Sequence, residues 1–140
     1  MMNVDFTRPF ATQILKSGNI LDEYQLGQTL IYIEYNNKKQ LTDLYTRIKN
    51  RYLDDYKRIP QINQFAHNIF LNRHPEYKSL FDNQDSTCLI AYSFHYYFDE
   101  NYIEYDCYIN HDFSDITDEI LEFAAIFIRY KDGKLEEACY

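Results

Sequence analysis

The sequence predicts an α+β fold, with helices packed on a small antiparallel sheet that contains a long β-hairpin at about residues 87–110. Two observations predict this fold. Apolar and polar side chains alternate through two consecutive stretches of the hairpin region, as they do in paired strands. In residues 39–58 and 60–72, apolar side chains recur every three or four positions, as they do in helices. The length of 140 residues fits a single domain, residues 1–140.

The N-terminal part of the chain, about residues 1–82, is expected to be rich in helix. A helix is predicted over residues 8–17, because Pro9 suits a first helical turn and Gly18 suits the position just after the last turn. The pattern of residues 20–28 is ambiguous.

A strand and two longer helices are expected next. The β-branched and aromatic side chains of residues 29–35 favour the strand. The helix over residues 39–58 has the clearest pattern, and Pro60 is expected to end it. Residues 60–72 repeat the helical spacing, and Pro75 begins a further short segment.

The predicted hairpin has one apolar face. With Asp99 and Glu100 as a two-residue loop, Tyr92 lies opposite Cys107. A loop placed one residue later keeps the same faces, so the exact register stays open. The apolar face consists of Cys88, Ile90, Tyr92, Phe94, Tyr96, Phe98, Ile103, Tyr105, Cys107 and Ile109.

The other face of the hairpin mixes aromatic and acidic side chains. It carries Ser93, His95, Tyr97, Tyr102, Glu104, Asp106 and Tyr108. One interpretation is a solvated sheet face. The other is a binding face, because tyrosine offers a large, stiff contact area and carboxylates select a basic partner.

The C-terminal region has two interpretations. The favoured one is a helix that begins at Asp115 as the N-cap and ends at Gly133. In the alternative, residues 124–130 form a strand that turns at Asp132 and Gly133 and returns through Leu135. The acidic tail at residues 136–137 is expected to fray.

Charge divides the chain into two parts. Residues 1–80 hold 11 Lys+Arg and 8 Asp+Glu, whereas residues 81–140 hold 3 and 14. A polar loop at residues 82–86 separates the helix-rich part from an acidic hairpin-plus-helix part at about residues 87–133. A field of one sign accelerates association with an oppositely charged partner and repels nucleic acid. No nucleic-acid partner is therefore expected. No membrane partner is expected either, because the unbroken apolar runs are too short to span a bilayer.

The basic side chains of the first part lie mainly on the predicted helix at residues 39–58. Arg47, Arg51 and Arg58 surround Asp54 there, and we interpret them as a solvated face with local ion pairs. A stripe that contacts a partner or nucleic acid is the alternative interpretation.

Several kinds of chemistry lack their usual motifs. The three cysteines, Cys88, Cys107 and Cys139, have no metal-binding spacing, and the three glycines form no phosphate loop. We therefore expect no cofactor and no metal. Because the N-terminus does not resemble a signal peptide, we also expect a cytoplasmic location and reduced thiols.

Histidine offers the one candidate for catalysis. His95, with Glu104 or Asp106 across the hairpin, could act as a base with its orienting carboxylate, or could bind a metal with His111 and Asp112. His67 is expected to be structural, and His74 is expected to close a loop.

In kind, the chain resembles the small acidic immunity proteins of bacterial contact-dependent inhibition systems, which neutralise toxins. The resemblance is carried by residues 90–98 and 102–109 and by the acids Asp99, Glu100, Glu104 and Asp106. It implies a protein-binding inhibitor without enzymatic activity, acting on a basic, nuclease-like toxin.

This hypothesis names the surface that contacts the toxin. The expected partner-binding residues are Tyr97, Asp99, Glu100, Tyr102, Glu104, Asp106, Tyr108, Asp112 and Asp115. The first alternative is a phage-type anti-restriction or anti-CRISPR protein that mimics nucleic acid, with carboxylates at 112–122 along one helix. The second alternative is a small enzyme that uses His95. The oligomeric state is open.

Overall fold

One mixed sheet organises the structure, a computed structural model that describes residues 3–82, 86–113 and 115–138. In these residues seven strands lie side by side in the order in which they occur in the sequence. They are β1 (Ala11–Ile14), β2 (Ile20–Leu26), β3 (Thr29–Tyr35), β4 (Leu89–Tyr97), β5 (Ile103–Ile109), β6 (Ala125–Lys131) and β7 (Lys134–Glu137). The fold is α+β, as the sequence predicts.

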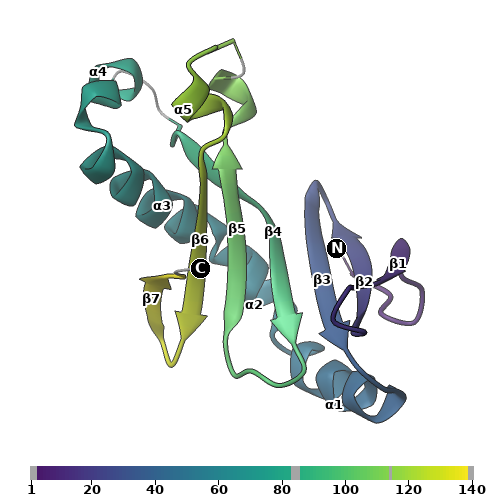
Figure 1. Cartoon of the computed structure of the whole chain (residues 1–140). Coiled ribbons are helices and arrows are strands. Elements are labelled where there is room, and N and C mark those ends of the chain that lie inside the picture. Colours follow the sequence, from purple (N-terminus) through teal and green to yellow (C-terminus); the bar gives the residue numbers. More distant parts are fainter. Residues whose placement is uncertain (1–2, 83–85, 114, 139–140) are drawn as a thin grey trace.

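The helices fall into two groups. The long connection between β3 and β4 contains α1 (Lys38–Ile48), α2 (Tyr52–Lys57), α3 (Ile59–Arg73), the 3₁₀ helix η1 (Pro75–Tyr77) and α4 (Lys78–Phe81). The connection between β5 and β6 contains the 3₁₀ helix η2 (His111–Phe113) and the short α5 (Glu119–Glu122). Figure 1 shows both groups around the sheet.

Neighbouring strands are antiparallel except at the centre of the sheet, where β3 and β4 are parallel. A parallel pair needs a long crossover connection, and α1–α4 supply it. The part that was expected to be rich in helix thus also contributes β1, β2 and β3.

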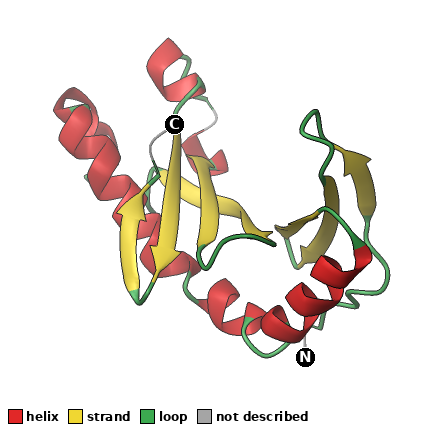
Figure 2. Ribbon diagram, turned by 60° about the horizontal axis from the view of Figure 1, so that its bottom comes forward, coloured by secondary structure: helices red, strands yellow, loops and turns green. Residues whose placement is uncertain are grey.

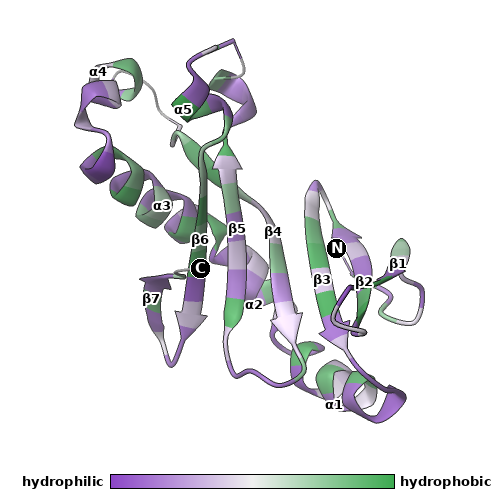
Figure 3. Cartoon of the chain, viewed as in Figure 1, coloured by the Kyte–Doolittle hydropathy of each residue, from purple (hydrophilic) through white to green (hydrophobic). Residues whose placement is uncertain are grey.

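The crossover places its helices on one side of the sheet. α3 packs against β4, β5 and β6, and α1 packs against β3. Figure 2 shows these helices along the outer side of the curved sheet. Strand residues alternate in hydropathy (Figure 3), and the apolar set faces the helices. The core between the two layers includes Ile31, Ile33, Phe94, Tyr96, Ile103, Tyr105, Ile128, Ile48, Ile62, Ala66 and Phe70.

The predicted hairpin is confirmed, with one change in register. Near the turn, Tyr96 pairs with Ile103 and His95 with Glu104, as expected for the first of the two loop positions. The register then shifts between Ala91 and Ser93, which leaves Tyr92 as an extra residue.

This β-bulge changes the face on which the first part of β4 points. Leu89 and Ala91 are buried in the core, whereas Ile90 and Tyr92, expected on the apolar face, are only half-buried. Asn63 of α3 accepts a hydrogen bond from the Ala91 backbone N–H at 2.7 Å. The helix layer therefore satisfies a backbone group at the irregularity.

The helix predicted at residues 8–17 is wrong. Residues Ala11–Ile14 form β1, which pairs with β2 along Ala11↔Glu23 to Ile14↔Ile20. Gly18, interpreted as a helix cap, has φ +89° in the turn between β1 and β2. Helix caps and hairpin turns both require positive φ, so the glycine signal could not separate them.

The helix predicted at residues 39–58 is broken in the structure. α1 ends at Ile48 and α2 begins at Tyr52, with a turn between them. Pro60, expected to end the helix, instead lies in the first turn of α3, where its missing N–H has no cost. The helix at 60–72 is confirmed as part of α3.

The favoured C-terminal helix is also wrong, and the strand alternative is confirmed. α5 is short and has Asp118, rather than Asp115, as its N-cap. β6 then turns into β7 through Asp132 and Gly133, with φ of 52° and 77°. Two consecutive positive φ values are typical of tight hairpin turns. The tail does not fray within the described residues, because Glu137 lies in β7 and pairs with Arg73.

A buried carboxylate joins the two layers. Asp55 of α2 is 1% exposed and accepts hydrogen bonds from Arg58 Nη1 at 2.8 Å and Arg51 Nε at 3.2 Å. The Tyr96 hydroxyl of β4 donates to the same carboxylate at 2.6 Å, and the Tyr105 hydroxyl of β5 donates to the Asp55 carbonyl at 2.8 Å. Arg51 and Arg58 thus form local ion pairs, but with buried Asp55 and not on a solvated face around exposed Asp54. Arg47 instead donates a hydrogen bond to the Tyr97 carbonyl at 2.8 Å.

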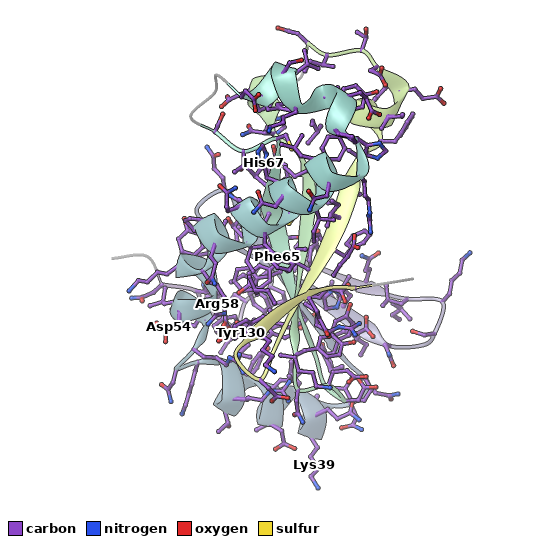
Figure 4. All side chains as sticks on the ribbon, turned by 90° about the vertical axis from the view of Figure 1, so that its left-hand side faces the viewer. Lys39, Asp54, Arg58, Phe65, His67 and Tyr130 are labelled. Atoms are coloured by element: carbon purple, nitrogen blue, oxygen red, sulfur yellow. The ribbon has the colours of Figure 1, made fainter. Side chains whose placement is uncertain are left out.

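Arg58 extends this connection to a third strand. Its guanidinium carbon lies 3.6 Å from the centroid of the Tyr130 ring of β6 (Figure 4). Asp54, the neighbour of Asp55, is exposed.

The cysteine and histidine expectations can be compared with the structure. Cys88 and Cys107 are free and buried, and Cys139 and residues 83–85 of the expected loop lie outside the described residues. His67 is structural, as expected, since its Nδ1 accepts a hydrogen bond from the Cys88 backbone N–H at 3.0 Å. His74 caps the C-terminal end of α3.

We expect Asp55→Asn to lower the free energy of unfolding by about 3 kcal/mol, because it leaves two partly buried arginines without their counter-charge. Asp54→Asn is the matched control and is expected to change stability by less than about 0.5 kcal/mol. Urea denaturation of both variants measures this difference. Equal stabilities for the two variants would contradict the central role of Asp55.

Candidate functional site

One face of the sheet is not covered by α1–α4 in the described residues, and we call it the open face. Its side chains alternate along the strands with the core residues that face the helices. From β2 to β6 the open face includes Leu21, Glu23, Leu30, Tyr32, Glu34, Tyr92, Ser93, His95, Tyr97, Glu104, Asp106, Tyr108, Phe127 and Arg129. Tyrosines and carboxylates dominate this set.

One row of open-face residues crosses the sheet. In strand order, its paired members are Glu23, Tyr32, His95, Glu104, Arg129 and Glu136. The Arg129 guanidinium lies 3.7 Å from Glu104 and 3.8 Å from Glu136, over the ring of Tyr102 at 4.0 Å. The Glu104 carboxylate, 4% exposed as a residue, is therefore buried and neutralised within the protein.

His95 lies in this row as a half-buried aromatic group. Its ring stacks on Tyr97 at a centroid distance of 4.1 Å, and its Nε2 is 3.5 Å from Glu34 Oε1. Burial lowers the pKa of His95 to about 4. The imidazole is therefore neutral at pH 7 and a weak base. Glu104 faces His95 across the hairpin, as predicted, but its ion pair is with Arg129.

A pocket of about 350 Å³ opens on this face where β3 meets β4. Tyr32, Tyr92 and Tyr108 supply aromatic walls, while Leu21 and Leu30 supply an apolar side. The pocket also contains Gln13, Ser93, His95 and Asp106. Both halves of the sheet thus contribute to one hollow.

The Tyr92 ring is held in place at the rim of the pocket. Its hydroxyl donates to the Ile109 carbonyl at 3.2 Å and accepts from the His111 backbone N–H at 3.0 Å. The centroids of the Tyr92 and His111 rings also lie 5.0 Å apart. The bulge that directs Tyr92 to the open face therefore provides a fixed wall.

Asp106 is the acid inside the pocket. Its Oδ2 accepts a hydrogen bond from Ser93 Oγ at 3.1 Å. Burial and the nearby Glu104 raise the pKa of Asp106 to about 6, and the Ser93 bond opposes this shift. No lysine, arginine or histidine in the described part of the chain forms an ion pair with it.

The structure separates the predicted partner-binding residues into three groups. Tyr97, Tyr102, Glu104, Asp106 and Tyr108 lie on the open face, Asp99 and Glu100 lie at the hairpin tip, and Asp112 and Asp115 lie beyond the other end of β5. The 7 residues of β5 separate the last two groups by roughly 20 Å. The nine residues thus do not form one continuous patch.

The segment that follows β5 carries several exposed acidic side chains, and we call it the acidic end. It consists of Asp112, Asp115, Asp118, Glu119 and Glu122 together with Ile120 and Phe123. The side chains of Ile120 and Phe123 are 46% and 73% exposed. Buried Phe113, in edge contact with Phe81 at 4.7 Å, attaches this segment to α4. The acids do not lie along one helix, because α5 spans only Glu119–Glu122.

Sequence reasoning missed the pocket residues outside the hairpin. Leu30 and Tyr32 lie in the strand that was predicted, but only the parallel pairing Tyr32↔His95 brings them beside Asp106. Leu21 lies in a segment with no assigned structure. The abundance of tyrosine was the available signal, and it did not indicate which strands would be neighbours.

Two further features bear on function. Among the described residues, no group of histidine, cysteine, aspartate and glutamate side chains has the arrangement of a metal site. In the same residues, no helix combines the length and apolar character needed to cross a membrane.

Comparison with protein-family models, curated proteins and solved structures finds no match to the chain.

We expect Asp106→Asn to raise the free energy of unfolding at pH 7 by about 1–3 kcal/mol. The folded-state pKa of Asp106 is about 6, above the roughly 3.9 of an unfolded chain, so the fold favours the protonated form. Its contribution to stability falls as the pH rises from about 4 to about 6. The advantage of Asp106→Asn should grow over the same interval.

Urea denaturation at pH 4 and at pH 7 measures this effect. Asp112→Asn, at an exposed acid, is the matched control and should change stability by less than about 0.5 kcal/mol at either pH. If Asp106→Asn is the less stable protein at pH 7, the carboxylate does not carry the unfavourable burial inferred here.

Proposed function

We propose that the protein is a non-enzymatic, protein-binding inhibitor, of the kind that serves as an immunity protein and neutralises a basic, nuclease-like toxin. The acidic end carries this proposal. It combines exposed carboxylates with two exposed large apolar side chains, Ile120 and Phe123.

The charges of the acidic end act together. Residues 79–128 contain no lysine or arginine, so no basic side chain of that stretch offsets them. Coulomb attraction from such a surface raises the association rate of a basic protein and repels acidic ones. By contrast, Glu104 is buried and Asp106 is half-buried, so they are less suited to long-range attraction.

The two apolar side chains, Ile120 and Phe123, can supply buried contact area, which charge alone does not supply. Exposed apolar groups rimmed by polar residues are typical of protein-binding sites, and aromatic residues are frequent among those that dominate binding energy. Phe123, next to Glu122, has this setting. Electrostatic attraction would then govern encounter, and burial of Phe123 and Ile120 would govern residence time.

The environments of the candidate catalytic groups favour a role without catalysis. Burial raises the pKa of Cys88 to about 12 and also raises that of Cys107, which suppresses the nucleophilic thiolate form. His95 is neutral at pH 7, and His67 uses its Nδ1 to bind backbone. These arrangements support binding as the function.

The first test is capture of a partner from source-cell lysate with tagged protein, washed at low and at high salt. We expect a basic protein to be retained, with faster loss at high salt because salt screens exposed charges. Retention of a restriction or CRISPR component instead would favour the nucleic-acid-mimic alternative. No retained protein at either salt concentration would contradict both.

We expect Glu119→Lys with Glu122→Lys to slow association with the captured partner by about tenfold at low salt. Phe123→Ala should raise its dissociation rate by about tenfold or more, corresponding to loss of a strong contact. Surface plasmon resonance measures both rates.

Matched controls lie on other elements of the fold, on α1 and next to β1. Asp43→Lys reverses an exposed charge on α1, and Phe10→Ala removes an aromatic side chain that is 67% exposed. Both controls should bind as the wild type does. Unchanged kinetics in the acidic-end variants would remove this surface from the interface.

A further inference from the structure

The pocket on the open face has a chemical character distinct from the acidic end. Three tyrosines, Tyr32, Tyr92 and Tyr108, and a carboxylate, Asp106, line a hollow of about 350 Å³. That volume is at the lower limit of typical ligand pockets, so it suits a single side chain better than a large molecule.

Asp106 differs from Asp55 and Glu104 in having no ion-pair partner among the described residues. Asp55 pairs with Arg51 and Arg58, and Glu104 pairs with Arg129. The Asp106 carboxylate instead accepts a hydrogen bond from the neutral Ser93 hydroxyl at 3.1 Å. A half-buried carboxylate of this kind is unfavourable for folding, which points to a use in binding.

The aromatic walls define which cation fits. A guanidinium group stacks on tyrosine rings and forms directional hydrogen bonds to a carboxylate, and it is more weakly hydrated than an ammonium group. The protein itself uses this arrangement twice, with Arg58 over Tyr130 at 3.6 Å and Arg129 over Tyr102 at 4.0 Å.

We propose that the pocket binds an arginine side chain of the partner protein, with its guanidinium stacked against the tyrosine walls and paired with Asp106. This inference rests on the proposed function, since it assumes a basic protein partner. The contact between Tyr92 and His111 places the pocket beside the first residues of the acidic end, so one partner can reach both.

The probe for this pocket is N-acetyl-arginine amide, with the uncharged N-acetyl-citrulline amide as its isostere. In ¹H–¹⁵N NMR titrations of the full chain, the arginine probe should shift amides of β3, β4 and β5 around Tyr32, Ser93 and Asp106. Its affinity should be in the millimolar range, as for an isolated side chain, and the citrulline probe should give no comparable shifts.

Two pocket variants and one control make the test specific. Asp106→Asn should weaken arginine binding about tenfold, even though the same variant is expected to be the more stable protein. Tyr108→Leu replaces the aromatic ring of a 42% exposed residue by an aliphatic side chain. Because the guanidinium loses one stacking surface, this variant should bind the probe about threefold more weakly. Asp43→Asn, at an exposed acid of α1, should leave the probe affinity unchanged.

The captured partner provides the second arm of the test. Asp106→Asn should raise its dissociation rate about tenfold, as expected when a charged hydrogen bond is lost. Absence of probe binding, or equal binding by wild type and Asp106→Asn, overturns the proposal and leaves the acidic-end experiment unaffected.

A third outcome separates the sources of the cation. If the probe binds through Asp106 but the partner binds Asp106→Asn as tightly as wild type, the partner's arginine is excluded. The pocket would then be assigned to a free small organic cation. Failure of the acidic-end variants alone would instead contradict the proposed function.

Discussion

The buried carboxylate of Asp55 is the interaction on which the two-layer arrangement depends. Because it is almost fully removed from water, it is stable only while Arg51, Arg58 and the Tyr96 hydroxyl surround it. Those donors come from both layers, so the carboxylate specifies how α2 lies on the sheet. Hydrophobic contacts alone are less directional and would permit more than one such placement.

The open face follows from the same topology. The helices of the central connection occur in one crossover, and such a crossover lies on one side of its sheet. Among the described residues there is no second long crossover, so no helix layer of that kind covers the opposite face. Its side chains, among them many tyrosines and acids, therefore face away from this chain's helices.

The sequence was sufficient wherever local periodicity decided the structure. The strands of the β4–β5 hairpin, α3 and β3 could be predicted because their side-chain patterns repeat within a few residues. The bulge at Tyr92 could not be predicted, because the alternation of the sequence continues through it, and the Asn63 contact with the Ala91 N–H is a tertiary one. Strand β1 was mistaken for a helix because Gly18 suits a cap and a hairpin turn equally well.

The candidate site illustrates the same limit. The tyrosine and acidic residues of the hairpin could be identified from alternation, but their exposure could not. Glu104 is buried and pairs with Arg129, a neighbour that lies in β6, where the sequence favoured a helix. The pocket could not be foreseen, since it requires the parallel pairing of Tyr32 with His95 across the centre of the sheet.

That central pairing has a consequence for how the protein assembles. β1–β3 and β4–β7 are antiparallel meanders with local contacts, whereas joining β3 to β4 closes a loop that includes all the central helices. The seam between the meanders is thus the least local part of the sheet, and the pocket lies across it. A ligand that contacts both sides adds its binding free energy to this seam. Partner binding and completion of the fold would then reinforce each other at one place.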